Sequence, residues 1–403
     1  GNPQTVSLML SGRSAFDPER GLLVRNEQTV QGVYTASSSA TTSGVMLDQF
    51  CIIDLHPDFV QVNKEIDAAL AGCGVQVDAS APHIIGLDNE TQTDMSRARA
   101  LRPMNDLIKA AGVDIAPERI IKDDWRVVAI VSTVEARHLM YRKDVLEAAN
   151  IPPPTSYGEI LRVSAQLRAM GVTDTPYAAA LQAGDDLAQT YIDVYVGMGG
   201  TLFLEGFDAS IYNPRGVATM EMMQMLAGYA PSDYMETDAD IVEQRLIAGD
   251  IVMAMLSSER AARILDRTGG KIAMTAAPIS GRRPAATLQW TGLGISADAT
   301  DAEATAAFKA IIEGINADMA RANPDTAAWL IDGYDAQMPS AAAIQTAREG
   351  ALTYPAGPEM SLLRDAIGTG IEPYLRGTVD PSRALLDIEL VYKRAAKAQG
   401  LIN

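Results

Sequence analysis

Residues 127–160 have the sequence VVAIVSTVEARHLMYRKDVLEAANIPPPTSYGEI, and this stretch decides the fold. It opens with the apolar run Val127–Val131, which has the length of a buried strand. Prolines at 152–154 then interrupt the chain, and Ser156 and Glu159 have the spacing of a capping box, which satisfies free N–H groups at a helix start. A buried strand followed by a capped helix is typical of an α/β protein.

The same alternation continues on both sides of this stretch. Strands are predicted at Thr5–Leu10, where Ser11 and Gly12 end the strand, at Cys51–Leu55 and at His83–Leu87. Helices are predicted over Phe59–Ala71, after Asn213-Pro214 and after Asp380-Pro381. Residues 13–39 have no clear period. Because strands separated by helices usually pair in parallel, we expect an α/β class with parallel sheets.

Composition and charge exclude several classes of protein. The 403 residues carry 33 Lys and Arg against 51 Asp and Glu, a net charge of −18, which argues against phosphate-mediated nucleic-acid binding and against docking on an anionic membrane. The hydrophobic share of 47% excludes a disordered chain. No apolar run approaches the roughly 20 residues that span a bilayer. We therefore expect a soluble, acidic protein of about two domains.

The cysteines and the first residues say little about the compartment. Cys51 and Cys73 are too few for a four-ligand zinc site, and they could form a disulfide or be two small buried side chains. The chain begins Gly1-Asn2-Pro3 with no basic segment followed by an apolar one, so we expect a signal peptide to be absent or already removed.

Motifs that carry chemistry are missing. The sequence has no HExxH pair of metal ligands, no GxxxxGK[ST] phosphate loop and no GxSxG nucleophile elbow. The segment Gly197–Gly200 follows a helical pattern and is interpreted as a helix terminus. We therefore expect no metal, no cofactor and no enzyme activity. A glycosidase that uses two of the 51 acidic residues stays open, because such carboxylates converge only in the fold.

Motifs in a fixed order along the chain resemble family 1 extracellular solute-binding proteins, the receptors of sugar-type ABC importers, of which maltose-binding protein is a member. The resemblance covers about Ile52 to the C-terminus and fits residues 13–39 poorly. It is carried by Ala81–Ile85, Leu101–Met104, Val134–Leu146, Pro153–Ile160, Leu246–Met255, Gln337–Ser340 and Gly377–Leu385.

The resemblance implies a two-lobed periplasmic-binding-protein fold of the class II type, with a ligand cleft between lobes joined by three crossings. Residues 1–136 plus 291–342 would form the N-terminal lobe, and residues 137–290 plus 343–403 the C-terminal lobe. The implied function is capture of a small polar solute, most simply a sugar or sugar derivative, by hinge closure and without catalysis. The implied partners are the membrane permease subunits of an ABC importer, and we expect a monomer in the periplasm, or outside the membrane of a Gram-positive host.

The resemblance also implies which residues contact the solute. They are Gly12, Arg13, Asp88, Asn89, Glu135, Gln182, Ser257, Glu259, Trp290 and Arg364. Carboxylates suit this role because each accepts several hydrogen bonds from vicinal hydroxyls. Structural roles stay open: Arg13 as a solvated loop charge, Asp88 as a strand-end cap, Glu135 in a hinge ion pair and Trp290 as a core side chain.

The implied cleft has fewer aromatic rings than sugar-binding members use for stacking on pyranoses. No ring stands in 256–260, and none follows Pro358–Ser361, so Trp290 is the best candidate. Arg13 and Arg364, expected on opposite lobes, would need compensating charge. If Asp88, Glu135 and Glu259 supply it, the solute is a neutral or mildly acidic sugar, which we favour.

Other functions stay open beside this one. If those carboxylates do not compensate the arginines, the protein binds a non-carbohydrate anionic solute. A glycoside-acting enzyme and a binding lobe that serves a sensor are the remaining alternatives. A receptor would return its ligand unchanged, which separates it from the enzyme.

Overall fold

The computed structural model describes residues 8–17, 22–32, 51–55, 84–322, 327–336 and 340–402. The chain divides into unit 1, Gly1–Thr133 and Trp290–Ala336, and unit 2, Val134–Gln289 and Gln337–Asn403. It therefore passes between the units after Thr133, after Gln289 and after Ala336. These positions lie near the lobe boundaries expected at residues 136, 290 and 342.

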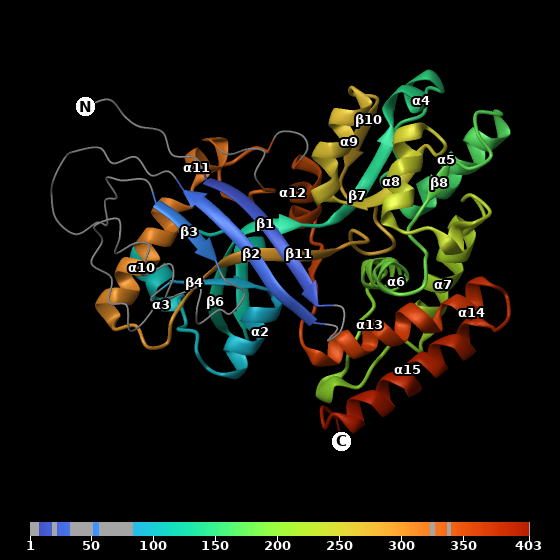
Figure 1. Cartoon of the computed structure of the whole chain (residues 1–403). Coiled ribbons are helices and arrows are strands. Elements are labelled where there is room, and N and C mark those ends of the chain that lie inside the picture. Colours follow the sequence, from blue (N-terminus) through green and yellow to red (C-terminus); the bar gives the residue numbers. More distant parts are fainter. Residues whose placement is uncertain are drawn as a thin grey trace. The chain divides into compact units, whose positions relative to one another are not determined.

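The described part of unit 1 contains a meander and a second sheet. β1 (Leu8–Asp17), β2 (Leu22–Gly32) and β3 (Cys51–Leu55) pair antiparallel in that order (Figure 1). In the second sheet, β4 (Ile84–Asp88) pairs antiparallel with β11 (Thr287–Ile295). The strand order then continues from β11 through β6 (Arg126–Glu135) to β5 (Ile120–Asp123).

The helices of unit 1 enclose an apolar core against this second sheet. They are α2 (Asn89–Arg97), α3 (Asn105–Ala111), the short 3₁₀ turn η1 (Pro117–Arg119), α10 (Asp301–Gly314) and α11 (Ala317–Ala322). Helix α10 begins with a capping box between Thr300 and Glu303, which satisfies N–H groups at its start. Its buried face, including Phe308 and Ile311, packs with Ile130 of β6, so burial of this face fixes the helix to the strand.

The sheet of unit 2 has the order β10-β7-β9-β8. These strands are β7 (Arg137–Arg142), β8 (Tyr177–Ala178), β9 (Met253–Ser257) and β10 (Ile272–Thr275). Met140, Ala254, Leu256 and Ile272 are buried in one core cluster with apolar residues of the neighbouring helices. The apolar side chains of these short strands are therefore buried on the inside of the unit.

Helices make up most of the rest of unit 2. They are α4 (Lys143–Ala148), α5 (Tyr157–Ala169), α6 (Asp185–Gly197), α7 (Pro214–Ala227), α8 (Ala239–Ala248), α9 (Ala261–Thr268), α12 (Ala341–Arg348), α13 (Pro358–Gly370), α14 (Glu372–Leu375) and α15 (Pro381–Ala398). The 3₁₀ turns η2 (Glu205–Phe207), η3 (Tyr234–Glu236) and η4 (Ser258–Arg260) and the strand β12 (Leu352–Thr353) complete the unit. Helix α13 packs against both α6 and α15 (Figure 1).

Helices α13 and α6 approach so closely that the contact requires glycine. A Cβ atom on Gly368 would lie 2.4 Å from the carbonyl oxygen of Gly184. The amide of Gly184 donates to the carbonyl of Gly368 at 3.0 Å, and its φ of 111° favours glycine as well. This backbone contact fixes the start of α6 against the middle of α13.

The predicted α/β class is confirmed, but the predicted parallel pairing is wrong. The pairs β7/β9, β7/β10, β4/β11 and β5/β6 are antiparallel. The pairs β8/β9 and β11/β12 are parallel, over two residue pairs each. The alternation of strands and helices does not fix strand direction when partners lie far apart in sequence, as β4 and β11 do.

Most predicted element starts agree with the structure. The strand at Cys51–Leu55 is β3, and helices α7 and α15 begin after the caps Asn213 and Asp380. Ser156 caps α5, while the carboxylate of Glu159 accepts from the amide of Thr155 at 2.8 Å. The helix predicted over 59–71, and Cys73, lie outside the described residues.

The first strand extends beyond its predicted end. β1 continues through Ser11 and Gly12 to Asp17, because it pairs along its whole length with β2. Gly12 and Arg13 therefore lie within a strand, opposite Gln28 and Glu27, and do not form the loop that was expected there. Pairing with a neighbouring strand can therefore keep a segment in the extended conformation even where its sequence shows no strand periodicity.

Candidate functional site

Two strand ends bring Glu135 and Ser257 together, 122 residues apart in sequence. β6 ends at Glu135, β9 ends at Ser257, and the Ser257 hydroxyl donates to Oε1 of Glu135. The amide of Ser258 donates to the carbonyl of Ala136 at 3.0 Å, and the amide of Ala136 donates to the Ser258 hydroxyl at 3.3 Å. This ladder holds the carboxylate and the hydroxyl in one place.

Glu135 is a partly buried carboxylate without a cation. Burial raises the pKa of Glu135, the hydrogen bond from Ser257 lowers it, and the negative charge of Glu259 raises it further. In the parts of the chain that the structure describes, no arginine or lysine pairs with Glu135. A carboxylate offers about four acceptor positions, and one of them is used here, so Glu135 keeps acceptors for a solute hydroxyl.

The exposed Glu259 lies on η4, and ion pairs that include the buried Glu243 hold that turn in place. Nη1 of Arg260 lies 2.8 Å from Oε2 of Glu243 and 2.5 Å from Oδ1 of Asp240. Glu243 is only 4% exposed and also accepts from Nε of Arg263 at 2.7 Å. The buried carboxylate of Glu243 on α8 thus binds Arg260 on η4 and Arg263 on α9, and this ties the three elements together next to Glu259.

Arg364, on α13, lies between an acidic and an aromatic partner. Its Nε is 2.9 Å from Oδ1 of Asp185 in the first turn of α6, an ion pair without hydrogen-bond alignment. Its Nη1 donates to the Tyr354 hydroxyl at 3.4 Å, and its Cζ lies 5.8 Å from the centre of that ring. The guanidinium therefore has its own carboxylate and its own aromatic neighbour.

The same part of α6 binds Arg137, the first residue of β7, two positions after Glu135. Nη1 of Arg137 donates to Thr190 at 2.9 Å, and Nη2 donates to Asp186 at 3.2 Å. Asp186 also accepts from the amide of Ala239 at 3.1 Å. The first two turns of α6 thus bind two arginines, Arg137 near Glu135 and Arg364 on α13.

Asp193, deeper on α6, fixes the helix to β11. Its Oδ1 accepts from the amide of Thr287 and from the Thr287 hydroxyl, both at 2.8 Å, and from Gln189 at 2.9 Å. Burial raises the pKa of Asp193 to about 6, against the lowering effects of Arg137 and these hydrogen bonds. The carboxylate holds β11 just before the chain leaves unit 2 at Gln289.

The other predicted residue of unit 2, Gln182, lies in the loop before α6. Its side chain is exposed, and its backbone N–H donates to the carbonyl of Thr237 at 3.0 Å. Unit 2 thus joins Glu135 and Ser257 directly and places Gln182 and Arg364 at the two segments that meet through Gly184 and Gly368.

The predicted residues of unit 1 have structural partners. Oδ1 of Asp88 caps α2 by accepting from the amide of Thr91 at 2.8 Å, and Oδ1 of Asn89 accepts from the amide of Trp290 at 2.9 Å. Trp290 is 3% exposed, and its indole Nε1 has no hydrogen-bond partner among the described residues. Whether Asp88, Asn89 and Trp290 also contact solute remains a prediction.

Asp185 and Tyr354 are site neighbours that the sequence did not indicate. Asp185 stands three residues after Gln182, but an acidic residue in the first turn of a helix is ordinary helix chemistry. Tyr354 lies ten residues before Arg364, outside the positions where rings were sought. Only the packing of α13 on α6 brings Asp185 to Arg364.

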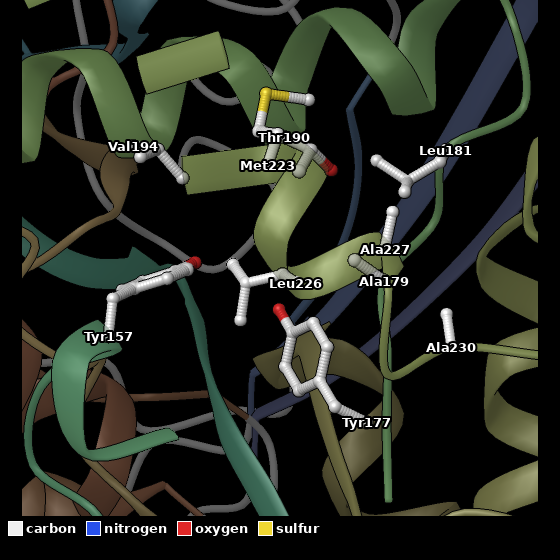
Figure 2. A pocket seen from close by; sticks show the side chains of 10 residues that line it. All are labelled: Tyr157, Tyr177, Ala179, Leu181, Thr190, Val194, Met223, Leu226, Ala227 and Ala230. Atoms are coloured by element: carbon white, nitrogen blue, oxygen red, sulfur yellow. The ribbon is translucent and has the colours of Figure 1, made fainter. Parts of the chain in front are cut away.

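A cavity in unit 2 is too small for a solute. It is lined by apolar residues and by Tyr157, Tyr177 and Thr190, and its volume of about 10 Å³ holds one water molecule (Figure 2). No group of three His, Cys, Asp or Glu side chains in the described chain is placed to hold a metal ion. Among the described helices, none is both long and apolar enough to cross a bilayer.

A sequence profile of bacterial extracellular solute-binding proteins matches residues 56–329, more than half of the chain. The chain belongs to this family. The fold of this solute-binding protein is the two-lobed α/β fold expected from the resemblance. No curated protein sequence matches it.

Solved structures with the same fold share little sequence with this solute-binding protein. One is a solute-binding protein of Agrobacterium radiobacter K84 in complex with ribitol, with 21% identity, a TM-score of 0.57, and coverage of 78% of this chain and 84% of that one. The maltose-bound MalE3 of T. maritima has 19% identity, a TM-score of 0.56, and coverage of 84% and 90%. UgpB of Mycobacterium tuberculosis, in complex with glycerophosphocholine, has 18% identity, a TM-score of 0.57, and coverage of 85% and 89%.

Proposed function

We propose that this protein captures a small polar solute, a sugar or sugar derivative, and passes it unchanged to an ABC importer. The observation that carries the proposal is Glu135, a desolvated carboxylate with unused acceptors beside the Ser257 hydroxyl. Vicinal hydroxyls match such a pair, because one can donate to the carboxylate and the other to the oxygen of Ser257, whose own hydrogen is used by Glu135. Ribitol and maltose, bound by two proteins of the same fold, have this chemistry.

The finer parts of the proposal concern motion, partner and location. Binding closes the two lobes by a hinge, and the closed form engages the membrane permease subunits. Small-angle scattering tests the closure, since the radius of gyration should fall when the solute is added. The site of action is the periplasm, or the outer face of the membrane in a Gram-positive host.

Thermal-shift screening over sugars, polyols and sugar acids is the first test. A ligand that binds only the folded state raises stability by RT ln(1 + [L]/Kd), about 2.7 kcal/mol at a hundredfold excess over Kd. A hit is then titrated by calorimetry, where one solute per chain is expected. A folded protein that binds no member of such a panel would contradict the proposal.

A glycoside-acting enzyme remains the second candidate, because a carboxyl with a raised pKa beside another carboxylate resembles a general-acid pair. Incubation of the identified solute with the protein, followed by mass spectrometry, separates the two functions. A receptor returns the solute intact after many hours, and an enzyme consumes it.

A further inference from the structure

We propose that Asp185 determines the class of solute, by neutralising Arg364 so that the site accepts neutral polyhydroxylated solutes and refuses anionic ones. This inference rests on the proposed function, because it assumes that Arg364 contacts the solute. It assigns a specificity role to Asp185, a residue in the first turn of α6.

The pairing of Arg364 with Asp185 carries the argument. An arginine that binds a carboxylate or phosphate solute does so with a free planar edge and an unopposed charge. In Arg364 the buried Nε lies 2.9 Å from Oδ1 of Asp185, so this carboxylate opposes the charge of the guanidinium, although the two atoms are not aligned for a hydrogen bond. An anion would have to displace the carboxylate of Asp185 or bind beside it, and both cost electrostatic energy.

The arginines that stand nearest in sequence to Glu135 and to Ser257, Arg137 and Arg260, also pair with acidic side chains. Arg137 has Asp186 at 3.2 Å, and Arg260 has Asp240 at 2.5 Å and Glu243 at 2.8 Å. In contrast, Glu135 has no cation in the described chain. The charge left without a partner around the candidate site is therefore negative, which repels an anionic solute.

Arg364 keeps donors for a neutral solute. Nη1 makes one hydrogen bond, at 3.4 Å to the Tyr354 hydroxyl, and Nη2 makes none with the residues that the structure describes. A guanidinium whose charge is balanced by a carboxylate still has N–H groups that donate to hydroxyl oxygens. The side chain is 28% exposed, so these donors can reach a solute.

The test compares matched neutral and anionic probes on the wild-type protein and on Asp185→Asn. The probes are ribitol with ribonate, and glucose with glucuronate and glucose 6-phosphate, titrated calorimetrically at about 20 mM and about 500 mM NaCl. Asp185 is 79% exposed, so the variant is expected to fold, and circular dichroism checks this. Asp387→Asn, which removes the acid of an exposed Arg383 pair on α15, is the matched control.

We expect the wild-type protein to bind a neutral probe at least about tenfold more tightly than its anionic partner. In Asp185→Asn, the anion should gain about tenfold or more at low salt and lose that gain at high salt, while Asp387→Asn behaves as wild type. The double variant Asp185→Asn/Arg364→Gln should lose the gain, because the freed guanidinium is its source.

Two results would overturn the inference while leaving the proposed function intact: wild-type protein that binds the anionic probe as tightly as the neutral one, or an Asp185→Asn variant whose preference is unchanged. If folded wild-type protein and both variants bind none of the probes, the proposed function fails on this panel, and the inference falls with it.

Discussion

Replacing Glu135 with Gln should weaken solute binding and stabilise the unliganded protein at the same time. The amide keeps the shape of the carboxylate and can still accept from the Ser257 hydroxyl. It removes a charge that is disfavoured before the solute arrives, since burial and the negative charge of Glu259 raise the pKa of Glu135. Unliganded Glu135→Gln should therefore melt at the wild-type temperature or above it.

The loss of affinity follows from the acceptors of this carboxylate. One of about four acceptor positions is used by Ser257, and a solute with vicinal hydroxyls would use one or two of the others. Loss of charge-assisted hydrogen bonds then costs about 1.5–3 kcal/mol, or roughly 10- to 150-fold in Kd. Titration calorimetry measures this, with Glu147→Gln, an exposed acid on α4, as the control.

The same reasoning gives a pH dependence. Solute hydroxyls bind the charged carboxylate, and protonation of a group with a raised pKa begins above the usual range of a glutamate. Wild-type affinity should therefore fall at a mildly acidic pH, and Glu135→Gln should not show this fall. Wild-type affinity of the Gln variant, or a lowered melting temperature with unchanged Kd, would refute the binding role and point to a structural one.

Further predictions concern stability. Burial lowers the pKa of His138 to about 4, so between pH 6.5 and pH 4 only the unfolded state takes up its proton. Stability falls over that interval by about 3 kcal/mol, and the difference between wild type and His138→Leu in urea denaturation at pH 7 and pH 4 should reveal this amount. Gly368→Ala places a Cβ 2.4 Å from the backbone oxygen of Gly184 and should destabilise the protein by about 1–3 kcal/mol in thermal denaturation. Gly158→Ala, whose Cβ would have 4.0 Å to its nearest neighbour, should be neutral or slightly stabilising, and equal losses in both variants would contradict the packing argument.

Local chemistry made part of the fold predictable. Helix starts were predicted from side chains that can cap a helix, and each of these residues is an N-cap in the structure: Ser156, Asn213 and Asp380. The direction and extent of strands depend on partners that lie elsewhere in the chain. This is why β1 passes through Gly12 and why β4 is antiparallel to β11, contrary to expectation.

The candidate site, too, was predictable only in part. Glu135 and Ser257 were predicted from motifs, and their contact depends on the pairing of β7 with β9, which sets Arg137 opposite Ser257. The motif around Arg364 gave the arginine but not its partner, because the packing of α13 on α6 determines that Asp185 faces it. Sequence motifs therefore supplied positions, and only tertiary packing supplied the charge balance that decides what they bind.

Because of where the tryptophans lie, tryptophan fluorescence and far-ultraviolet circular dichroism report mainly on different units. The chain has three tryptophans, and Trp125, Trp290 and Trp329 all belong to unit 1. Trp125 is 67% exposed, while Trp290 and Trp329 are 3% and 5% exposed, so iodide should quench one emitter and leave two shielded. Emission then follows the unfolding of unit 1, whereas far-ultraviolet ellipticity is dominated by the many helices of unit 2. Melting curves from the two signals coincide if the units unfold as one cooperative block, and they separate if each unit melts independently.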